Sequence, residues 1–219
     1  SDFDRAMLAM KPAFDIGFCV SQLVAVAEGG QRIGDLMVPD DQVGFGTVCS
    51  IVINGALLKA GVPMDSRFSG TLQMNNRKPM RFTEIIRYDG CSIDPSEIFI
   101  KARMTSVTET ITTGGGEILA NFRETPALCI PLVDSVVAGL KAAGIDGVID
   151  RGNPSEAVCE VAVEPNKVGL VLIGGLNPVA AAQEVGVEAE NHSMSTVVDF
   201  QDLIKFTDLV GERSSQKNK

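Results

Sequence analysis

The feature that most constrains this chain is an internal repeat. Residues 43–74 align with residues 168–199 without a gap, at a shift of 125 positions. The matched pairs include Val43-Gly44 with Val168-Gly169, Ala56 with Ala181, Gly61-Val62 with Gly186-Val187, and Thr71 with Thr196. Each copy has the pattern of a strand, a glycine-containing turn, a helix, a second such turn and a strand. Self-similarity of this kind predicts a fold built around two related units.

The repeat extends beyond this core and indicates the fold class. With the upstream match of Val38 and Val163 it covers about residues 32–74 and 157–199, and Arg81–Tyr88 has a weaker counterpart in Asp199–Phe206. Several strands follow one another without an intervening helix, which favours the α+β class. The sequence therefore predicts two pseudo-symmetric halves from an internal duplication, with helices packed on a mixed β-sheet.

The region between the two copies alternates helices and strands. A helix is predicted from the capping sequence Asp94-Pro95-Ser96-Glu97 to about Thr110. The further predicted elements are strands over Glu117–Arg123, Val148–Asp150 and Ala157–Val163, and a helix over Pro126–Ala143. Residues 1–13 are predicted to be an N-terminal extension and residues 14–210 one folded domain. Residues 211–219 are predicted to be a disordered tail, because the last eight residues have no apolar side chain.

Composition excludes several classes of function. The net charge of −9 argues against direct binding of nucleic acid by this chain, although a DNA-binding domain can be joined to it in a longer protein. No apolar run has the length of a membrane span and no secretory leader is present, so no membrane contact and a cytoplasmic location are expected. Five scattered cysteines without a CxxC pair are typical of reduced thiols. A single histidine, His192, rules out a multi-histidine metal site.

The main candidate binding residues lie in the two loops that precede the repeat helices. A strand that leads through small residues into a helix leaves backbone N–H groups unpaired, and the helix dipole favours an anion there. The predicted contacts are Gly46, Thr47, Val48, Cys49 and Ser50 in the first loop, and Gly174, Gly175 and Asn177 in the second. Neither loop has the GxxxxGK[ST] or GxGxxG spacing of a nucleotide site. In the alternative interpretation the glycines only form turns and the hydroxyls only cap helices.

An arginine among small hydroxyl residues is a second candidate. Ser66 and Arg67 open the predicted strand Ser66–Met74, and a guanidinium group binds a carboxylate through two parallel hydrogen bonds. Arg81 and Arg123 are weaker candidates for the same role. The alternative for Arg67 is a surface arginine beside a turn.

Catalytic chemistry finds little support in the sequence. Cys49 stands at a predicted helix start, where a thiolate is favoured, and Cys49 or Ser50 would be the nucleophile of an enzyme. The only histidine is distant in sequence, and no nucleophile-elbow pattern surrounds Ser193 or Ser195. No catalytic residue is therefore predicted, and an enzyme acting on a small keto acid remains an alternative.

Seven long stretches carry a family resemblance. They are VGFGTVCSIVINGALLKAGVP (Val43–Pro63), SRFSG (Ser66–Gly70), RFTEIIRYDG (Arg81–Gly90), IDPSEIFIKARMTSV (Ile93–Val107), EILANFRETPA (Glu117–Ala127), VGLVLIGGLNPVAAAQEVGVE (Val168–Glu188) and SMSTVVDF (Ser193–Phe200). Through them the chain, from about Phe14 to Leu209, resembles the effector-binding regulatory domain of the archaeal nitrogen-regulation repressors, the NrpR family.

The resemblance implies a function and partners. It implies an effector-sensing, dimerising domain of a repressor that binds 2-oxoglutarate, with no further cofactor, and so relieves repression of nitrogen-fixation and assimilation genes. Family members contact DNA through a winged helix-turn-helix domain, which is absent from this chain. The implied partners are a second copy in a homodimer and, as in some members, a PII-type signalling protein.

The resemblance places the effector contacts in the stretch Thr47–Ser50, which is intact here. Ser69-Gly70 departs from the pattern, because two glycines are expected there, and this can alter how closely a ligand approaches the strand. Either copy of the repeat, or both, can hold the ligand in this interpretation. The alternatives are the enzyme mentioned above and a dimerisation or PII-docking module with no ligand of its own.

Overall fold

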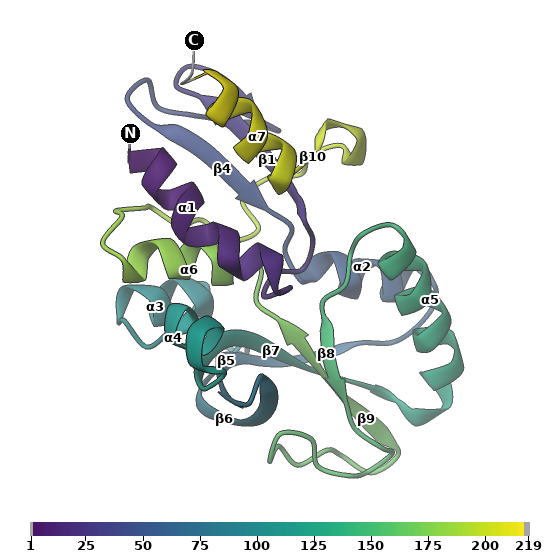
Figure 1. The fold of residues 1–219 in the computed structure, drawn as a ribbon. Coiled ribbons are helices and arrows are strands. Elements are labelled where there is room, and N and C mark those ends of the chain that lie inside the picture. Colours follow the sequence, from purple (N-terminus) through teal and green to yellow (C-terminus); the bar gives the residue numbers. More distant parts are fainter. Residues whose placement is uncertain (1, 217–219) are drawn as a thin grey trace.

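The computed structural model describes residues 2–216, with side chains described as far as Gly211 (Figure 1). The helices are α1 (Asp2–Asp15), α2 (Ile51–Lys59), α3 (Pro95–Lys101), α4 (Val107–Thr113), α5 (Ile130–Ala142), α6 (Asn177–Glu184) and α7 (Phe206–Gln216), with short 3-10 turns η1 (Ala127–Cys129) and η2 (Phe200–Asp202). The strands are β1 (Leu23–Glu28), β2 (Arg32–Ile33), β3 (Leu36–Met37), β4 (Val43–Thr47), β5 (Asp65–Asn75), β6 (Lys78–Arg87), β7 (Gly116–Pro126), β8 (Val148–Arg151), β9 (Lys167–Ile173) and β10 (Ile204–Lys205).

The strands divide into sheets that belong to two parts of the molecule. The upper part in Figure 1 contains the order β10-β1-β4 beside α1 and α7, and the lower part contains the order β6-β5-β7-β9-β8. Strands β2 and β3 form a separate hairpin. The predicted α+β class is confirmed. The predicted mixed sheet is wrong, because all strand pairs of the described residues are antiparallel.

The larger core is built on the five-stranded sheet. Strand β7 lies at its centre and is buried along almost its whole length, since both of its neighbours and the helices around it exclude water. Phe122 of β7 stacks on Phe68 of β5 at 5.2 Å between ring centroids, and Phe82 of β6 meets Phe68 edge-on at 4.9 Å. Helices α2, α3, α4, α5 and α6 all contribute buried side chains to this core.

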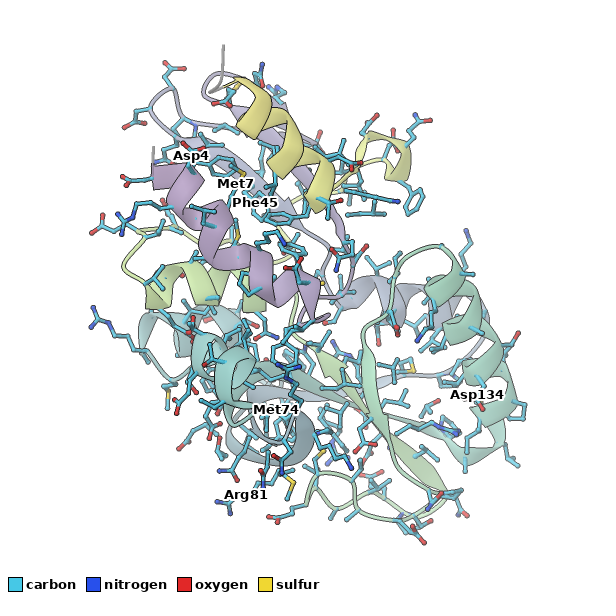
Figure 2. The ribbon with its side chains drawn as sticks, viewed as in Figure 1. Asp4, Met7, Phe45, Met74, Arg81 and Asp134 are labelled. Atoms are coloured by element: carbon cyan, nitrogen blue, oxygen red, sulfur yellow. The ribbon has the colours of Figure 1, made fainter. Side chains whose placement is uncertain are left out.

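The smaller core joins the two ends of the chain. Phe14 of α1 stacks on Phe206 of α7 at 4.1 Å, and Met7, Met10 and Val24 are buried around them. Figure 2 shows Met7 of α1 and Phe45 of β4 in this upper part, far from Met74 and Arg81 in the five-stranded sheet. Most of the predicted N-terminal extension, residues 1–13, is therefore a packed helix, because its apolar residues recur at helical spacing on one face.

The predicted disordered tail is also helical in part. Helix α7 continues to Gln216, so residues 211–216 have helical backbone in place of disorder. Residues 217–219 of the predicted tail lie outside the described residues. The helix begins at the buried Phe206, and this anchor was the signal missing from a prediction based on polar composition alone.

The internal repeat is recognisable for one strand and one helix in each copy. Strand β4 and helix α2 correspond at the shift of 125 positions to β9 and α6. The two units are not equivalent in their surroundings, because β4 belongs to the three-stranded sheet and β9 to the five-stranded sheet. The strand that should close the second copy does not form. Residues 188–199 have no regular structure, since Ser193 and Asp199 stand at the positions of the buried Phe68 and Met74 of β5.

Two other sequence predictions need correction. The helix expected from Asp94 to Thr110 is divided into α3 and α4, because Arg103 adopts a positive φ of 55° that no helix continues through. Its predicted start is confirmed, since the Asp94 side chain accepts a hydrogen bond from the Ser96 N–H at 2.8 Å. The strand expected over Ala157–Val163 is a tight turn closed by a single bridge between Val158 and Val161.

The smaller core predicts a large effect of removing one ring. Phe206→Ala should lower the free energy of unfolding by about 3–5 kcal/mol, because Phe206 is 1% exposed and contacts two other aromatic rings. Phe200→Ala is the matched control; this ring is 57% exposed, and its loss should cost less than about 0.5 kcal/mol. Urea unfolding followed by circular dichroism measures both. Equal effects would show that α7 does not hold the core together.

Candidate functional site

A cleft of about 1690 Å³ lies between the two parts of the molecule. Its walls come from α1 and β4 on one side and from α6 and the polar side chains of β7 on the other. Residues 188–199, which have no regular structure, line a further wall and are tied by four hydrogen bonds. Ser193 N–H donates to Glu97, the Asp35 N–H donates to Thr196, and the Gln183 side chain of α6 bonds both Ala189 and Asn191. The cleft is therefore enclosed by segments from both ends and the middle of the chain.

The two predicted loops meet at this cleft. The Thr47 hydroxyl donates a hydrogen bond of 2.9 Å to the carbonyl oxygen of Gly175. A Cβ atom at Gly175 would lie 2.6 Å from the carbonyl oxygen of Val48, so only glycine permits this approach. The five predicted residues of the first loop, Gly46 to Ser50, line the cleft together with Gly175. The sequence prediction that both loops contribute to one place is supported by this geometry.

A chain of polar side chains runs from the first loop into the sheet. The Ser50 hydroxyl accepts a hydrogen bond from the Asn121 amide at 3.1 Å, and the Asn121 carbonyl oxygen accepts one from the Tyr88 hydroxyl at 2.6 Å. Ser50 is the N-cap residue of α2 but makes no side-chain cap hydrogen bond. Two of the first N–H groups of α2 are already bonded, because Val52 donates to the Cys49 carbonyl oxygen and Ile53 donates to the Ser50 carbonyl oxygen, each at 3.1 Å. The helix dipole still favours negative charge at this end of α2.

Arg123 is the unusual residue of the site. It lies opposite Ser66 in the β5–β7 register, lines the cleft and is only 3% exposed. Its guanidinium lies 5.3 Å above the centre of the Tyr88 ring. Within the described side chains, its Nε and Nη1 atoms are buried and have no hydrogen-bond partner. A buried charge without a hydrogen-bonded anion is costly, so the guanidinium is available to bind a carboxylate.

Arg67, which the sequence favoured for this role, is engaged elsewhere. Its guanidinium lies 2.7 Å from the fully buried Glu124 carboxylate and 3.3 Å from Glu164, and Lys167 completes the cluster at 3.4 Å from Glu124. These carboxylates raise the pKa of Arg67 against the opposing effect of burial. Arg67 is not among the residues that line the cleft. Its neighbour Ser66 does line it, which leaves Ser66 as a candidate contact.

Asn177 and Gly174 also have structural roles. The Asn177 side chain is fully buried; it accepts a hydrogen bond from the Leu119 N–H at 2.7 Å and donates to the carbonyl oxygens of Leu119 and Gly174. A Cβ atom at Gly174 would lie 2.6 Å from the Leu119 side chain. Both residues therefore hold the start of α6 against β7, and neither lines the cleft.

The sequence contained a signal for Arg123. The stretch EILANFRETP is nearly continuous in its burial, and an arginine within such a strand is exceptional unless it has a partner or a function. Tyr88 and Asn121 gave no comparable signal. Tyr88 follows the end of β6, and only the fold brings it against β7.

Cys49 is a poor candidate for a nucleophile. Burial raises the pKa of its thiol above the ordinary value, and the Asp94 carboxylate adds to this rise while Arg123 opposes it. The thiol is therefore protonated at neutral pH, whereas nucleophilic cysteines need a lowered pKa. His192 is exposed and lies 3.3 Å from Glu190 within residues 188–199.

The described part of the chain lacks both a metal-binding cluster and a membrane-spanning helix. No group of three or more histidine, cysteine, aspartate or glutamate side chains within it has the arrangement of a metal site. Among residues 2–216, none of the helices combines the length and apolar character needed to cross a bilayer.

The fold and the cleft define an α+β domain whose two parts enclose a polar, arginine-containing pocket. The chain belongs to the NrpR regulatory domain family: the profile described as "NrpR regulatory domains NRD1 and 2" matches residues 1–205. The family resemblance deduced from the sequence is thus confirmed.

Relatives support the same assignment. The chain is 34% identical over 202 residues to a protein named global nitrogen regulator NrpRI from Methanosarcina mazei, covering 92% of this chain and 62% of that protein. It is 27% identical over 206 residues to global nitrogen regulator NrpR of Methanocaldococcus jannaschii, covering 94% of this chain and 34% of the relative. The chain therefore spans about three fifths or less of the length of these relatives.

A solved structure has the same fold. The crystal structure of a nitrogen repressor-like protein from Methanococcus jannaschii superposes with a TM-score of 0.75 at 28% sequence identity. The superposition covers 93% of this chain and 82% of that one. The two-part architecture is therefore shared across the family and is not peculiar to this sequence.

The role of Asn177 can be tested by stability. Asn177→Ala should lower the free energy of unfolding by about 1–3 kcal/mol, because the buried Leu119 N–H loses its acceptor. The exposed Asn153→Ala is the control and should change it by less than about 0.5 kcal/mol. Chemical denaturation of both variants measures this. Unchanged stability of Asn177→Ala would return Asn177 to the list of ligand contacts.

A buried charged residue that serves ligand binding should lower the stability of the protein when no ligand is bound. Arg123→Met should leave the free energy of unfolding unchanged or raise it by about 1–3 kcal/mol, because an unpartnered charge is removed from the interior. Arg67→Met should lower it by about 3 kcal/mol, since the buried Glu124 loses its nearest cation. Urea unfolding without added ligand compares the two. A loss for Arg123→Met as large as that for Arg67→Met would make Arg123 a structural residue.

Proposed function

We propose that this chain is the effector-sensing and dimerising domain of a nitrogen-responsive transcriptional repressor, and that 2-oxoglutarate is its effector. The membership of the NrpR regulatory domain family and the names of the relatives, global nitrogen regulators, support the nitrogen response. The observation that carries the ligand is Arg123, a buried guanidinium without a hydrogen-bonded anion in a cleft between two parts of the fold.

The chemistry of the site suits a small dicarboxylate with a keto group. One carboxylate pairs with the fork of Arg123, which can donate two parallel hydrogen bonds. The other lies within the reach of the start of α2, where the helix dipole favours negative charge. Hydroxyl donors from Ser50 and Ser66 are available to the remaining oxygens, and both side chains line the cleft.

The proposed mechanism is a shift between two arrangements of the domain. The cleft walls come from both parts of the molecule, so a ligand that contacts both stabilises the arrangement in which they are correctly spaced. A nearly complete shift needs about 5 kcal/mol of differential affinity between the two states. The signal passes to DNA through a winged helix-turn-helix domain outside this chain, in a homodimer, and a PII-type protein is a further candidate partner.

The enzyme alternative is not favoured by the geometry. Of the candidate nucleophiles, Cys49 has a pKa raised mainly by burial, and the Asp94 carboxylate raises it further. A dimerisation or PII-docking module without a ligand would leave the burial of Arg123 unexplained. The same residues therefore favour a ligand-sensing domain over an enzyme and over a docking module without a ligand.

The proposal is tested by calorimetric titration of 2-oxoglutarate into the 219-residue chain, with glutarate as the analogue lacking the keto oxygen. Saturable binding is expected, clearly tighter for 2-oxoglutarate than for glutarate. Arg123→Lys should weaken it about tenfold or more, because lysine keeps the charge but loses the bidentate fork. Ser50→Ala should weaken it as well, since it breaks the hydrogen bond to Asn121 at the helix start.

Arg81→Lys is the matched control. Arg81 is an exposed arginine on β6 whose side chain donates a hydrogen bond to Gln73, and it lies far from Phe45 in the lower part of the molecule (Figure 2). The variant makes the same exchange as Arg123→Lys outside the cleft and should leave the affinity unchanged. A folded protein that shows no heat of binding would refute the ligand and favour the dimerisation or PII-docking module.

A further inference from the structure

A carboxylate stands in the same part of the cleft as Arg123. Asp94, in the connection between β6 and α3, lines the cleft together with Arg123, Tyr88 and Cys49. Tyr88 is a neighbour of both charged groups. Its ring centre lies 5.3 Å from the Arg123 guanidinium, and Tyr88 also lines a side pocket together with Asp94. The pKa of the Tyr88 hydroxyl, which burial raises, is accordingly lowered by Arg123 and raised by Asp94.

The two charges do not neutralise each other directly. Among the described residues, no ion pair within 4.0 Å joins Arg123 to any carboxylate. Asp94 uses Oδ1 to accept the hydrogen bond from Ser96 N–H that caps α3, and in the described structure its Oδ2 has no hydrogen-bond partner. An unpaired cation and a free carboxylate oxygen thus line one cleft without a direct ion pair between them.

Asp94 adds to the anion-binding groups of this cleft a group that favours a ligand with a positive charge beside its carboxylate. A carboxylate near the ligand repels the second negative charge of a dicarboxylate. An α-amino acid instead places an ammonium group beside its α-carboxylate, so the same molecule can donate to Asp94 and accept from Arg123. Both resulting hydrogen bonds would be charge-assisted, which are the stronger kind.

We propose that the cleft also binds an α-amino dicarboxylate of the same carbon skeleton as the effector, with its α-carboxylate on Arg123 and its ammonium on Asp94, in competition with 2-oxoglutarate. L-Glutamate is the probe for this class, because it differs from 2-oxoglutarate only by an ammonium group in place of the keto oxygen. The inference rests on the proposed function for the competition, but the binding of the amino acid is measurable by itself. Asp94 is then the residue that sets the preference between the two ligands.

Competition between the two ligands would make the domain sensitive to the ratio of their concentrations. Two ligands that share the anchor Arg123 exclude each other, so occupancy by the keto acid depends on the concentration of the amino acid as well. If only the keto acid favours the released arrangement, the amino acid holds the domain in the other one. The domain then responds to the relative amounts of a keto acid and its aminated product.

The variant Asp94→Asn tests the proposal with little risk to folding. Asparagine is as good an N-cap residue as aspartate, so α3 keeps its cap while the charge is removed. In the wild-type chain, L-glutamate should bind in a direct titration and reduce the apparent affinity for 2-oxoglutarate. In Asp94→Asn, L-glutamate should bind about tenfold more weakly, because a charge-assisted hydrogen bond is lost, and 2-oxoglutarate should bind at least as tightly as before.

Asp89→Asn is the control for charge. Asp89 precedes Asp94 in the same connection, is largely exposed and does not line the cleft. It should leave both affinities unchanged. If wild-type protein binds 2-oxoglutarate but L-glutamate neither binds nor competes, or if Asp94→Asn changes both affinities equally, the inference is overturned and the proposed function stands. Binding of L-glutamate without 2-oxoglutarate would overturn the proposed function and retain the role of Asp94.

Discussion

The contact between the two repeat loops is the constraint on which the site depends. Thr47 bonds the backbone of Gly175, and the missing side chain at that glycine lets the Val48 carbonyl approach within reach. This contact fixes the start of α2 against the five-stranded sheet, although α2 follows a strand of the other sheet. The spacing between the two parts, and hence the shape of the cleft, follows from one hydroxyl and one glycine.

Charge in the site is arranged differently from charge elsewhere in the chain. The cluster of Arg67, Lys167 and Glu124 is mutually satisfied and joins the ends of neighbouring strands. Arg123, which is buried, has no such ion pair among the described residues, and its guanidinium lies over the Tyr88 ring. Stable folds rarely keep a buried cation of this kind without use, because a neutral side chain would pack there at lower cost.

The sequence predicted the duplicated strand and helix, the α+β class and the first loop, because glycine punctuation and apolar periodicity are local signals. It misjudged residues whose role depends on distant neighbours. Arg67 was predicted to bind the ligand's carboxylate, but the fold pairs it with Glu124. Asn177 was predicted to contact the ligand, but its side chain is hydrogen-bonded to Leu119. Arg123 was ranked too low, although its position in a predicted strand was a signal, because the neighbours that bury the strand lie far away in the sequence. Helix α1 was taken for an extension for the same reason.

The missing last strand of the second repeat has an evolutionary consequence. Strand β5 is fixed by hydrogen bonds to two neighbours, whereas its counterpart, residues 188–199, is held by isolated bonds that include those at Ser193 and Thr196. Because residues 188–199 belong to no strand, that segment could change in length and sequence without disturbing either core. Duplication thus supplied a rigid copy and a variable one, and lineages of this family have in the variable copy a place to retune the cleft while the scaffold stays intact.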